Sequence, residues 1–362
     1  MLVIHAGLPK VASTSLQTYL YNNRVRIALA GIDYHIGINE RAAFSLVREL
    51  EVKNQTPATV EISNLELSVS AHPSRIRILS AESLFDSRNL RLNLLRPVLE
   101  TTTSRLIILI REPISHLFSA WTEAIKAGSS VYFHDFVNHA HRNRTFFLGE
   151  VAQGWLGQTP IQDIRFLPIS QGFPLSGVLP HFALPVDLSI DNPSENVSFS
   201  TTELSLIFRS NQRIRDRVTL AGLWPITSEA LDDPRTQEAF QFIHETFRPM
   251  YEVASSGVPR PPEDSQEITE LVEILSDYRR DWCRDAKAII GQIEHLEFDP
   301  TSSTDANLFI ESCSTENINI LNLISKITQI ENGTVDQAVS EPVLRLIEGL
   351  VAKSLNLFSF QK

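Results

Sequence analysis

Residues 2–17 have the sequence LVIHAGLPKVASTSLQ. The segment begins with a short apolar run, residues 2–6, that stops at Gly7, and such a run is typical of a buried strand in a parallel sheet. A helix is predicted from Ser13 onward, because Leu16, Tyr19 and Leu20 recur at helical spacing. The segment therefore predicts a strand, a loop and a helix, which is the repeating unit of an α/β fold.

The loop between this strand and helix has the features of an anion-binding site. Backbone N–H groups at a helix N-terminus bind anions, and the hydroxyls of Ser13, Thr14 and Ser15 add donors. Lys10 supplies a positive charge within the loop. A plain strand–turn–helix junction with polar capping residues is the alternative interpretation. The loop is not that of the nucleoside triphosphatases, which ends in Gly-Lys-Ser/Thr.

Further strands are expected where apolar runs recur, and the segments between them have helical patterns. A helix is expected to begin at Pro113, because proline is tolerated at the first helical position. The sequence therefore predicts the α/β class, with a parallel sheet flanked by helices and a helical C-terminal region. The additional strands are expected at 75–80, 105–110 and 163–167, and the later helices at 201–211, 234–247 and 265–296.

The chain is expected to divide into a domain over residues 1–298 and a helical C-terminal extension over residues 306–362. The α/β core of the first domain should end near residue 215, and a Pro/Ser/Thr-rich linker begins at Pro300. The extension carries an apolar stripe at helical spacing, which predicts that it packs on the domain or on a second copy of the chain. The stripe consists of Ile320, Leu323, Ile324 and Ile327.

Two further polar clusters follow predicted strands. Glu82 comes just after the strand at 75–80, and Arg111 directly follows the strand at 105–110. Ser119 lies eight residues after Arg111, on the helix that Pro113 begins. Taken alone, each has an ordinary interpretation as a polar residue at a strand or helix surface. Together with Lys10, however, Glu82 and Arg111 belong at the carboxyl edge of one sheet, where ligands bind in open parallel sheets.

These three clusters together resemble the PAPS-dependent sulfotransferases, in which PAPS is 3′-phosphoadenosine 5′-phosphosulfate. The loop resembles that family's 5′-phosphosulfate loop, Pro-Lys-Thr-Gly-Thr/Ser-Thr/Ser, and is closest to the bacterial and Golgi-type carbohydrate branch. This chain departs from the pattern at Val11 and at Ala12, which stands where the family has glycine. Residues 110–121 resemble the family's 3′-phosphate motif, and residues 80–85 resemble the segment that carries its base.

The resemblance implies a P-loop-like fold and PAPS as the sulfuryl donor, with no metal. It implies that Lys10 stabilises charge on the leaving group and that Glu82 accepts the proton of an acceptor hydroxyl, with a carbohydrate as the favoured acceptor. The residues that it implies for cofactor binding are Pro9, Lys10, Val11, Ala12, Ser13, Thr14, Ser15, Arg111 and Ser119.

Two other functions fit the same fold class. One is a nucleotide kinase or related P-loop phosphotransferase, which would require ATP and magnesium and would lack its usual Gly-Lys-Ser/Thr. The other is a non-catalytic nucleotide-binding or interaction protein, which the departures at Val11 and Ala12 keep open. A nucleotide titration and a turnover assay distinguish these functions.

The composition argues against several classes of binding partner and against a metal site. The net charge of −11 argues against nucleic acid and anionic membranes, which bind basic surfaces. The two cysteines, Cys283 and Cys313, have no metal-ligand spacing, and an isolated group of His134, His139 and His141 fits no metal motif. No secretory signal or bilayer-spanning stretch is recognised, so we expect a cytoplasmic protein. His5, at the end of the first strand, is expected to be a core or strand-end histidine.

Overall fold

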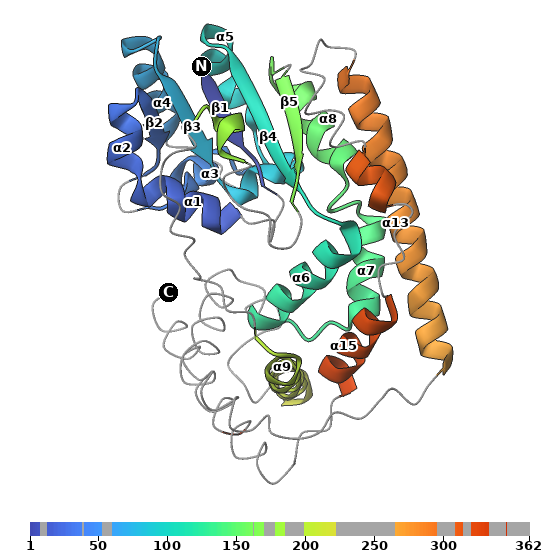
Figure 1. Ribbon diagram of the computed structural model, residues 1–362. Coiled ribbons are helices and arrows are strands. Elements are labelled where there is room, and N and C mark those ends of the chain that lie inside the picture. The colour runs from blue at the N-terminus through green and yellow to red at the C-terminus, as the bar shows by residue number, and fades with distance from the viewer. Residues whose placement is uncertain are drawn as a thin grey trace. The chain divides into compact units, whose positions relative to one another are not determined.

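A computed structural model describes residues 1–7, 13–37, 40–52, 60–161, 163–169, 178–184, 199–221, 265–294, 308–313, 320–332 and 345 (Figure 1). The chain falls into two compact units. The first, which we call the sheet unit, comprises residues 1–116, 140–195 and 278–316. The second, which we call the helical unit, comprises residues 117–139, 196–277 and 317–362. The expected division at residues 298–306 stays a prediction.

The sheet unit is built on five parallel strands in the order β2-β3-β1-β4-β5. Every residue of β1 is buried, and so are the last five residues of β4, as expected for central strands covered on both faces. This confirms the predicted α/β class with a parallel sheet flanked by helices. The strands are β1 (Leu2–His5), β2 (Ile32–His35), β3 (Ile76–Ser80), β4 (Ser104–Ile110) and β5 (Asp163–Pro168).

The strand order creates a switch point at the carboxyl edge of the sheet. β1 lies between β3 and β4. The chain leaves β1 toward β2 on one side and leaves β4 toward β5 on the other. Adjacent strands whose connections run in opposite directions leave a crevice outside their carboxyl ends, where ligands bind in such sheets. A functional site is therefore expected at the carboxyl ends of β1 and β4.

β2 is the strand that the sequence did not predict. Its four residues include a single aliphatic side chain, Ile32, and only that residue is buried. β2 lies at the edge of the sheet and pairs with β3 alone. An edge strand needs little apolar surface, so it leaves a weak pattern in the sequence. Gly31 precedes it with a positive φ of 82°, which glycine adopts at no steric cost.

Helices of the sheet unit connect and flank the strands, and α2 lies beside β2 (Figure 1). The predicted helix after the loop is α1 (Ser13–Asn22), on which Leu16, Tyr19 and Leu20 are buried. The other described helices that lie wholly in this unit are α2 (Arg24–Leu29), α3 (Phe44–Leu50), α4 (Val60–Ala71), α5 (Arg96–Thr101) and α8 (Leu148–Gln158).

β3 carries a buried charge that fixes α4 to the sheet. Arg77 is 1% exposed, and its guanidinium donates to Ser68 Oγ at 2.9 Å and to the carbonyl of His72 at 2.9 Å. Carbonyls at a helix C-terminus have no partner within the helix, so the buried arginine satisfies groups that would otherwise lose their hydration.

Three helices contribute residues to both units: α6 (Pro113–Lys126), α7 (Phe133–Arg142) and α13 (Ser265–Glu294). α6 begins at Pro113 as predicted, and Gly128 follows its end with φ of 94°. α13 covers most of the helix expected at 265–296. The helix predicted at 234–247 and the linker after Pro300 lie outside the described residues.

The helical unit has its own apolar core. The Trp121 ring lies 5.1 Å from that of Phe133 and 6.1 Å from that of Phe208. α9 (Thr201–Ala221) is longer than the predicted 201–211 helix, and it packs against α15 (Ile320–Asn332). Ile324 and Ile327 are buried, so this part of the predicted apolar stripe packs within the chain. Among the described helices, none is long and apolar enough to cross a membrane.

Candidate functional site

The predicted loop begins at the carboxyl end of β1. Pro9, Lys10, Val11 and Ala12 lie outside the described residues, but Gly7 and Ser13 on either side are described. A Cβ atom on Gly7 would come within 2.1 Å of Ser13 Oγ. The end of β1 and the start of α1 are therefore in direct contact, and any side chain at position 7 would separate them.

The three hydroxyl residues at the start of α1 differ in their surroundings. Ser13 is 1% exposed, whereas Thr14 is exposed and Ser15 is half-buried. N–H groups in the first turn of a helix have no carbonyl partner within the helix, and the macrodipole places partial positive charge there. The first turn of α1 is therefore suited to an anion, at the edge of the sheet where ligands bind.

Glu82 lies next to the start of α1. It is the first residue of the 3₁₀ helix η1 (Glu82–Phe85), which follows β3 directly, and the N–H of Ala81 donates to the carbonyl of His5 at 3.2 Å. Thr14 Oγ1 lies 3.5 Å from Glu82 Oε1, at the outer limit of a hydrogen bond. The fold thus brings together the predicted base and a predicted cofactor-binding hydroxyl, 68 residues apart in the sequence.

Arg111 directly follows β4, on the other side of the switch point. In the register of the sheet, His5 of β1 pairs with Ile107, and Arg111 comes four residues after Ile107, just beyond the end of β4. The side chain is half-buried, and burial lowers the pKa of its guanidinium, against the opposing effect of Glu112. A partly desolvated guanidinium interacts strongly with anions, which suits the predicted role in phosphate recognition.

Glu112 has a structural role that the sequence analysis missed. Its carboxylate accepts the N–H of Ile114 at 3.1 Å and of Ser115 at 2.6 Å, and it thereby caps the N-terminus of α6. An acidic residue directly before proline was the available signal. Arg279 of α13 lies 3.6 Å from Glu112, a contact across a sequence distance too large for any local pattern to predict.

Ser119 is the predicted partner of Arg111 in binding the 3′-phosphate. It is half-buried on α6, and its carbonyl accepts the hydroxyl of Thr122 at 3.0 Å. Ser119 belongs to the helical unit, whereas Arg111 belongs to the sheet unit. Their pairing stays a prediction.

His5 is a strand-end histidine, as expected, and it is completely buried. Its Nδ1 lies 2.8 Å from Ser80 Oγ across the β1–β3 pair, and its ring meets the edge of Phe182 at 5.9 Å between centroids. Burial lowers the pKa of His5 to about 3, so the ring is neutral at physiological pH. No local pattern could have indicated the Ser80 contact, because it joins residues 75 positions apart.

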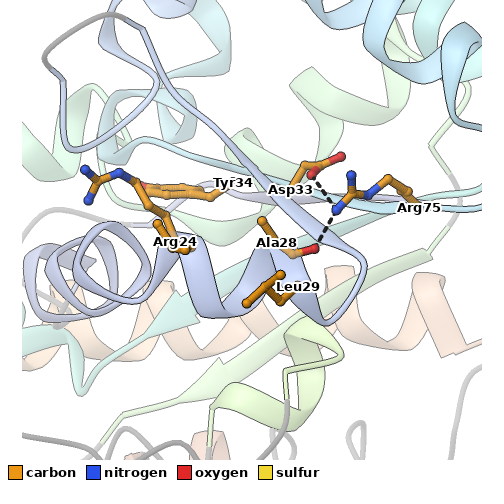
Figure 2. A pocket seen from close by; sticks show the side chains of 7 residues that line it. Arg24, Ala28, Leu29, Asp33, Tyr34 and Arg75 are labelled. Carbon is orange, nitrogen blue, oxygen red and sulfur yellow. Dashed lines mark hydrogen bonds and ion pairs between the residues drawn. The ribbon is translucent and has the colours of Figure 1, made fainter.

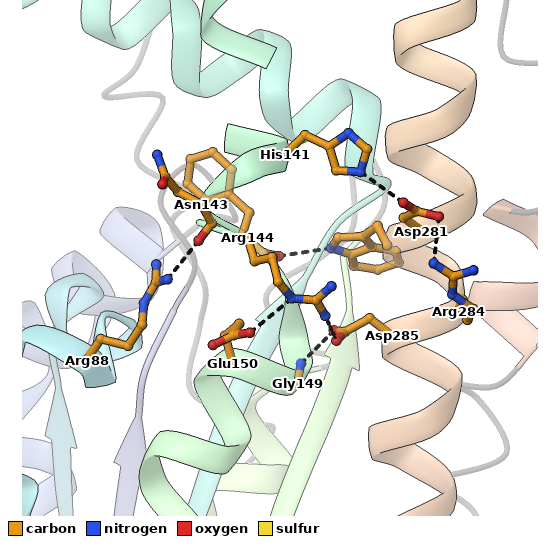
Figure 3. Close-up of polar contacts among 11 residues, drawn as sticks. Arg88, His141, Asn143, Arg144, Gly149, Glu150, Asp281, Arg284 and Asp285 are labelled. Carbon is orange, nitrogen blue, oxygen red and sulfur yellow. Dashed lines mark hydrogen bonds and ion pairs between the residues drawn. The ribbon is translucent and has the colours of Figure 1, made fainter. Parts of the chain in front are cut away.

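His134 and His141, from the histidine group noted in the sequence, lie beside carboxylates. His134 lies 3.4 Å from its neighbour Asp135, and His141 pairs with Asp281 at 3.0 Å (Figure 3). In the described part of the chain, no group of three or more His, Cys, Asp or Glu side chains is placed to hold a metal ion. Both cysteines are buried and unlinked.

An open hollow of about 550 Å³ lies elsewhere, between α2 and the edge strand β2 (Figure 2). Arg75, at its margin, pairs with Asp33 at 3.2 Å and donates to the carbonyl of Ala28 at 2.6 Å. Of the predicted site residues that the structure describes, none lines this hollow. The residues that line it are Arg24, Val25, Ala28, Leu29, Asp33, Tyr34 and Arg75.

Comparison of this chain with models of protein families, with curated proteins and with solved structures finds no match.

Proposed function

We propose that this protein is a sulfotransferase that transfers a sulfuryl group from PAPS to an acceptor hydroxyl. The contact between Thr14 and Glu82 is the observation that carries the proposal. It joins the turn that would hold the donor's 5′-phosphate to the carboxylate that would accept the acceptor's proton. Arg111 follows β4 across the switch point, where the nucleotide's second phosphate would bind.

Donor binding would use the positive end of α1 and the loop before it. The N–H groups at the start of α1 and the Lys10 ammonium would hold the 5′-phosphosulfate. Arg111, with Ser119, would bind the 3′-phosphate that distinguishes PAPS from ATP. Lys10 would also stabilise the negative charge that develops on the oxygen bridging sulfur and phosphorus as that bond breaks.

The reaction would be an in-line displacement at sulfur. The acceptor oxygen forms a bond to sulfur as the bond from sulfur to the bridging oxygen breaks, which releases 3′-phosphoadenosine 5′-phosphate. The acceptor's proton passes to the Glu82 carboxylate, since a hydroxyl is a weak nucleophile at neutral pH. Positioning and electrostatic stabilisation would supply most of the acceleration, by analogy with phosphoryl transfer. A carbohydrate hydroxyl is the acceptor that the resemblance favours.

Calorimetry tests the donor assignment. The protein should bind 3′-phosphoadenosine 5′-phosphate far more tightly than 5′-AMP, and Arg111→Ala should lose about 2–4 kcal/mol of that binding. Arg105→Ala is the matched control. Arg105 lies in β4, which Arg111 directly follows, and it pairs with Asp163 at 2.5 Å, so its loss should leave nucleotide affinity unchanged. Equal affinity for the two nucleotides would rule out the proposal.

Turnover with labelled PAPS and a panel of glycans and small hydroxyl compounds tests the reaction. Transfer of label to an acceptor, without added magnesium, is the expected result. Tight binding of ATP only in the presence of magnesium would instead support a kinase. Tight binding of 3′-phosphoadenosine 5′-phosphate with no transfer to any acceptor would support a non-catalytic nucleotide-binding protein.

A further inference from the structure

Two buried polar atoms at the carboxyl end of β1 have no hydrogen-bond partner among the described residues. They are His5 Nε2 and Ser13 Oγ, from side chains that are 0% and 1% exposed. A Cβ built on Gly7 would lie 2.8 Å from the first atom and 2.1 Å from the second, so both face the same small space beside Gly7. Buried polar atoms without partners are rare and costly, and two of them facing one space require an explanation.

The neighbouring hydrogen bonds determine which nitrogen of His5 carries the proton. Tyr34 donates its hydroxyl proton to the carbonyl of Arg41 at 2.7 Å, so its oxygen can only accept another bond. Burial raises the pKa of Tyr34 and Ser80 opposes that rise, as expected of a hydroxyl that donates to the phenol oxygen, so Ser80 is the donor there. The single proton of Ser80 is then committed, and the 2.8 Å contact with His5 requires Nδ1–H as the donor. A neutral His5 consequently has an unprotonated Nε2.

We propose that His5 is a positioning residue whose unprotonated Nε2 accepts the hydroxyl of Ser13, directly or through one water molecule. The pair fixes the start of α1 against the end of β1, and so holds both ends of the predicted phosphate loop. Ser13 would then contribute its backbone N–H to the ligand, while its hydroxyl serves His5. Of the three hydroxyls in this turn, only Thr14 and Ser15 remain for the ligand.

This inference deepens the proposed function, and its nucleotide measurement rests on that function. The small space also accounts for glycine at position 7, because any Cβ would displace the Ser13 hydroxyl or the His5 ring. The edge contact of Phe182 holds that ring in place. The arrangement requires a neutral imidazole, and the completely buried site of His5 provides it.

The first test uses no ligand. Spectra of protein labelled with ¹⁵N-histidine should show, near pH 7, a His5 ring protonated at Nδ1 and bare at Nε2, with its signals assigned by their loss in a His5→Gln variant. A proton on Nε2 would overturn the inference whether or not the protein is a sulfotransferase.

The second test uses two substitutions that separate the two ends of the ring. Asparagine at position 5 keeps an amide near the Nδ1 site and its contact with Ser80 but removes the atom that faces Ser13. Glutamine places an amide near the Nε2 site. His5→Asn should speed amide exchange in the peptide spanning residues 1–20 by about tenfold and weaken binding of 3′-phosphoadenosine 5′-phosphate by about tenfold. His5→Gln should have a smaller effect on both, and the reverse order would overturn the inference.

Ser13→Ala provides a check in case both His5 variants fail to fold, since alanine is a good helix former. It should speed exchange in the same peptide about tenfold while the His5 tautomer and the Ser80 contact persist. Where the variants fold, combining Ser13→Ala with His5→Asn should add little to either single change. Wild-type exchange in Ser13→Ala, or full additivity of the two changes, would overturn the inference. If wild-type protein binds no 3′-phosphoadenosine 5′-phosphate, the proposed function fails, but the tautomer and exchange results still decide this inference.

Discussion

Two polar regions of the sheet unit satisfy their hydrogen bonds to different degrees. The region between α8 and α13, which we call the α8–α13 cluster, contains Arg144, Gly149, Glu150 and Asp285 (Figure 3). Arg144 contacts both Glu150 and Asp285, and the N–H of Gly149 donates to Asp285 at 2.7 Å. At the end of β1, by contrast, the described part of the chain offers no hydrogen-bond partner to the buried atoms His5 Nε2 and Ser13 Oγ.

The contrast indicates what each region does. In the α8–α13 cluster, polar groups that are removed from water recover their interactions within the protein, so the cluster stabilises the fold. At the end of β1, the fold bears the cost of two unsatisfied atoms beside a helix N-terminus. Such a cost is expected where a site awaits a ligand or an ordered water. We therefore expect substitutions in the first region to affect stability and substitutions in the second to affect binding and turnover.

The largest expected effect is on turnover. Glu82→Gln keeps the size of the side chain but removes its basicity, so kcat should fall by about 10²–10⁴-fold while affinity for 3′-phosphoadenosine 5′-phosphate stays near wild type. Glu150→Gln is the matched change in the α8–α13 cluster and should leave kcat unchanged. Steady-state assays of both variants with labelled PAPS provide the measurement. Near-normal kcat in Glu82→Gln would place the base elsewhere.

The next effect is on stability. The Asp285 carboxylate is largely buried, and burial raises its pKa, against the opposing Gly149 and Arg144 contacts. Asp285→Asn should reduce the free energy of unfolding by about 2 kcal/mol, because it removes the buried charge that accepts from both Arg144 and the N–H of Gly149. Asp281→Asn, at a more exposed carboxylate that pairs with His141, should cost less than about 1 kcal/mol. Urea denaturation measures both, and equal losses would contradict this account of the cluster.

The pH dependence of stability tests the burial of His5. Its folded pKa of about 3 lies below the ordinary 6.5, so between these values the unfolded chain binds more protons than the folded one. The stability that neutral His5 contributes is therefore fully present above pH 6.5 and is lost as the pH falls. At pH 5 the wild type should have lost about 2 kcal/mol more of its free energy of unfolding than His5→Gln, in which position 5 cannot titrate.

Denaturation of both proteins at pH 7 and at pH 5 measures the difference. Burial also lowers the pKa of His35, which both proteins retain. Parallel losses in the two proteins would show that His5 titrates normally.

The smallest expected effect concerns the contact that carries the proposed function. Thr14→Val removes the hydroxyl that lies 3.5 Å from Glu82 and keeps the shape of the side chain. Because a bond of that length is weak, kcat should fall only about threefold. Ser83→Ala, at the exposed neighbour of Glu82, should have no effect on kcat. A loss of about 100-fold in Thr14→Val would show that Thr14 contacts the reacting groups directly.

The sequence by itself determined the elements and their class. Apolar runs indicated β1, β3, β4 and β5, and α1 and α6 begin at the predicted Ser13 and Pro113. Since parallel strands share one carboxyl edge, the sequence also placed Glu82 and Arg111 at that edge. These inferences depend on local patterns, which the sequence contains in full.

Only the tertiary structure decided how these elements meet. It set the order β2-β3-β1-β4-β5 and added the edge strand β2, whose residues carry little apolar signal. It buried Ser13 beside His5 while leaving Thr14 exposed and facing Glu82, although the sequence presents the two hydroxyls as equivalent. It also paired His5 with Ser80. Each of these facts depends on contacts between segments far apart in the chain, and no local period or propensity specifies such contacts.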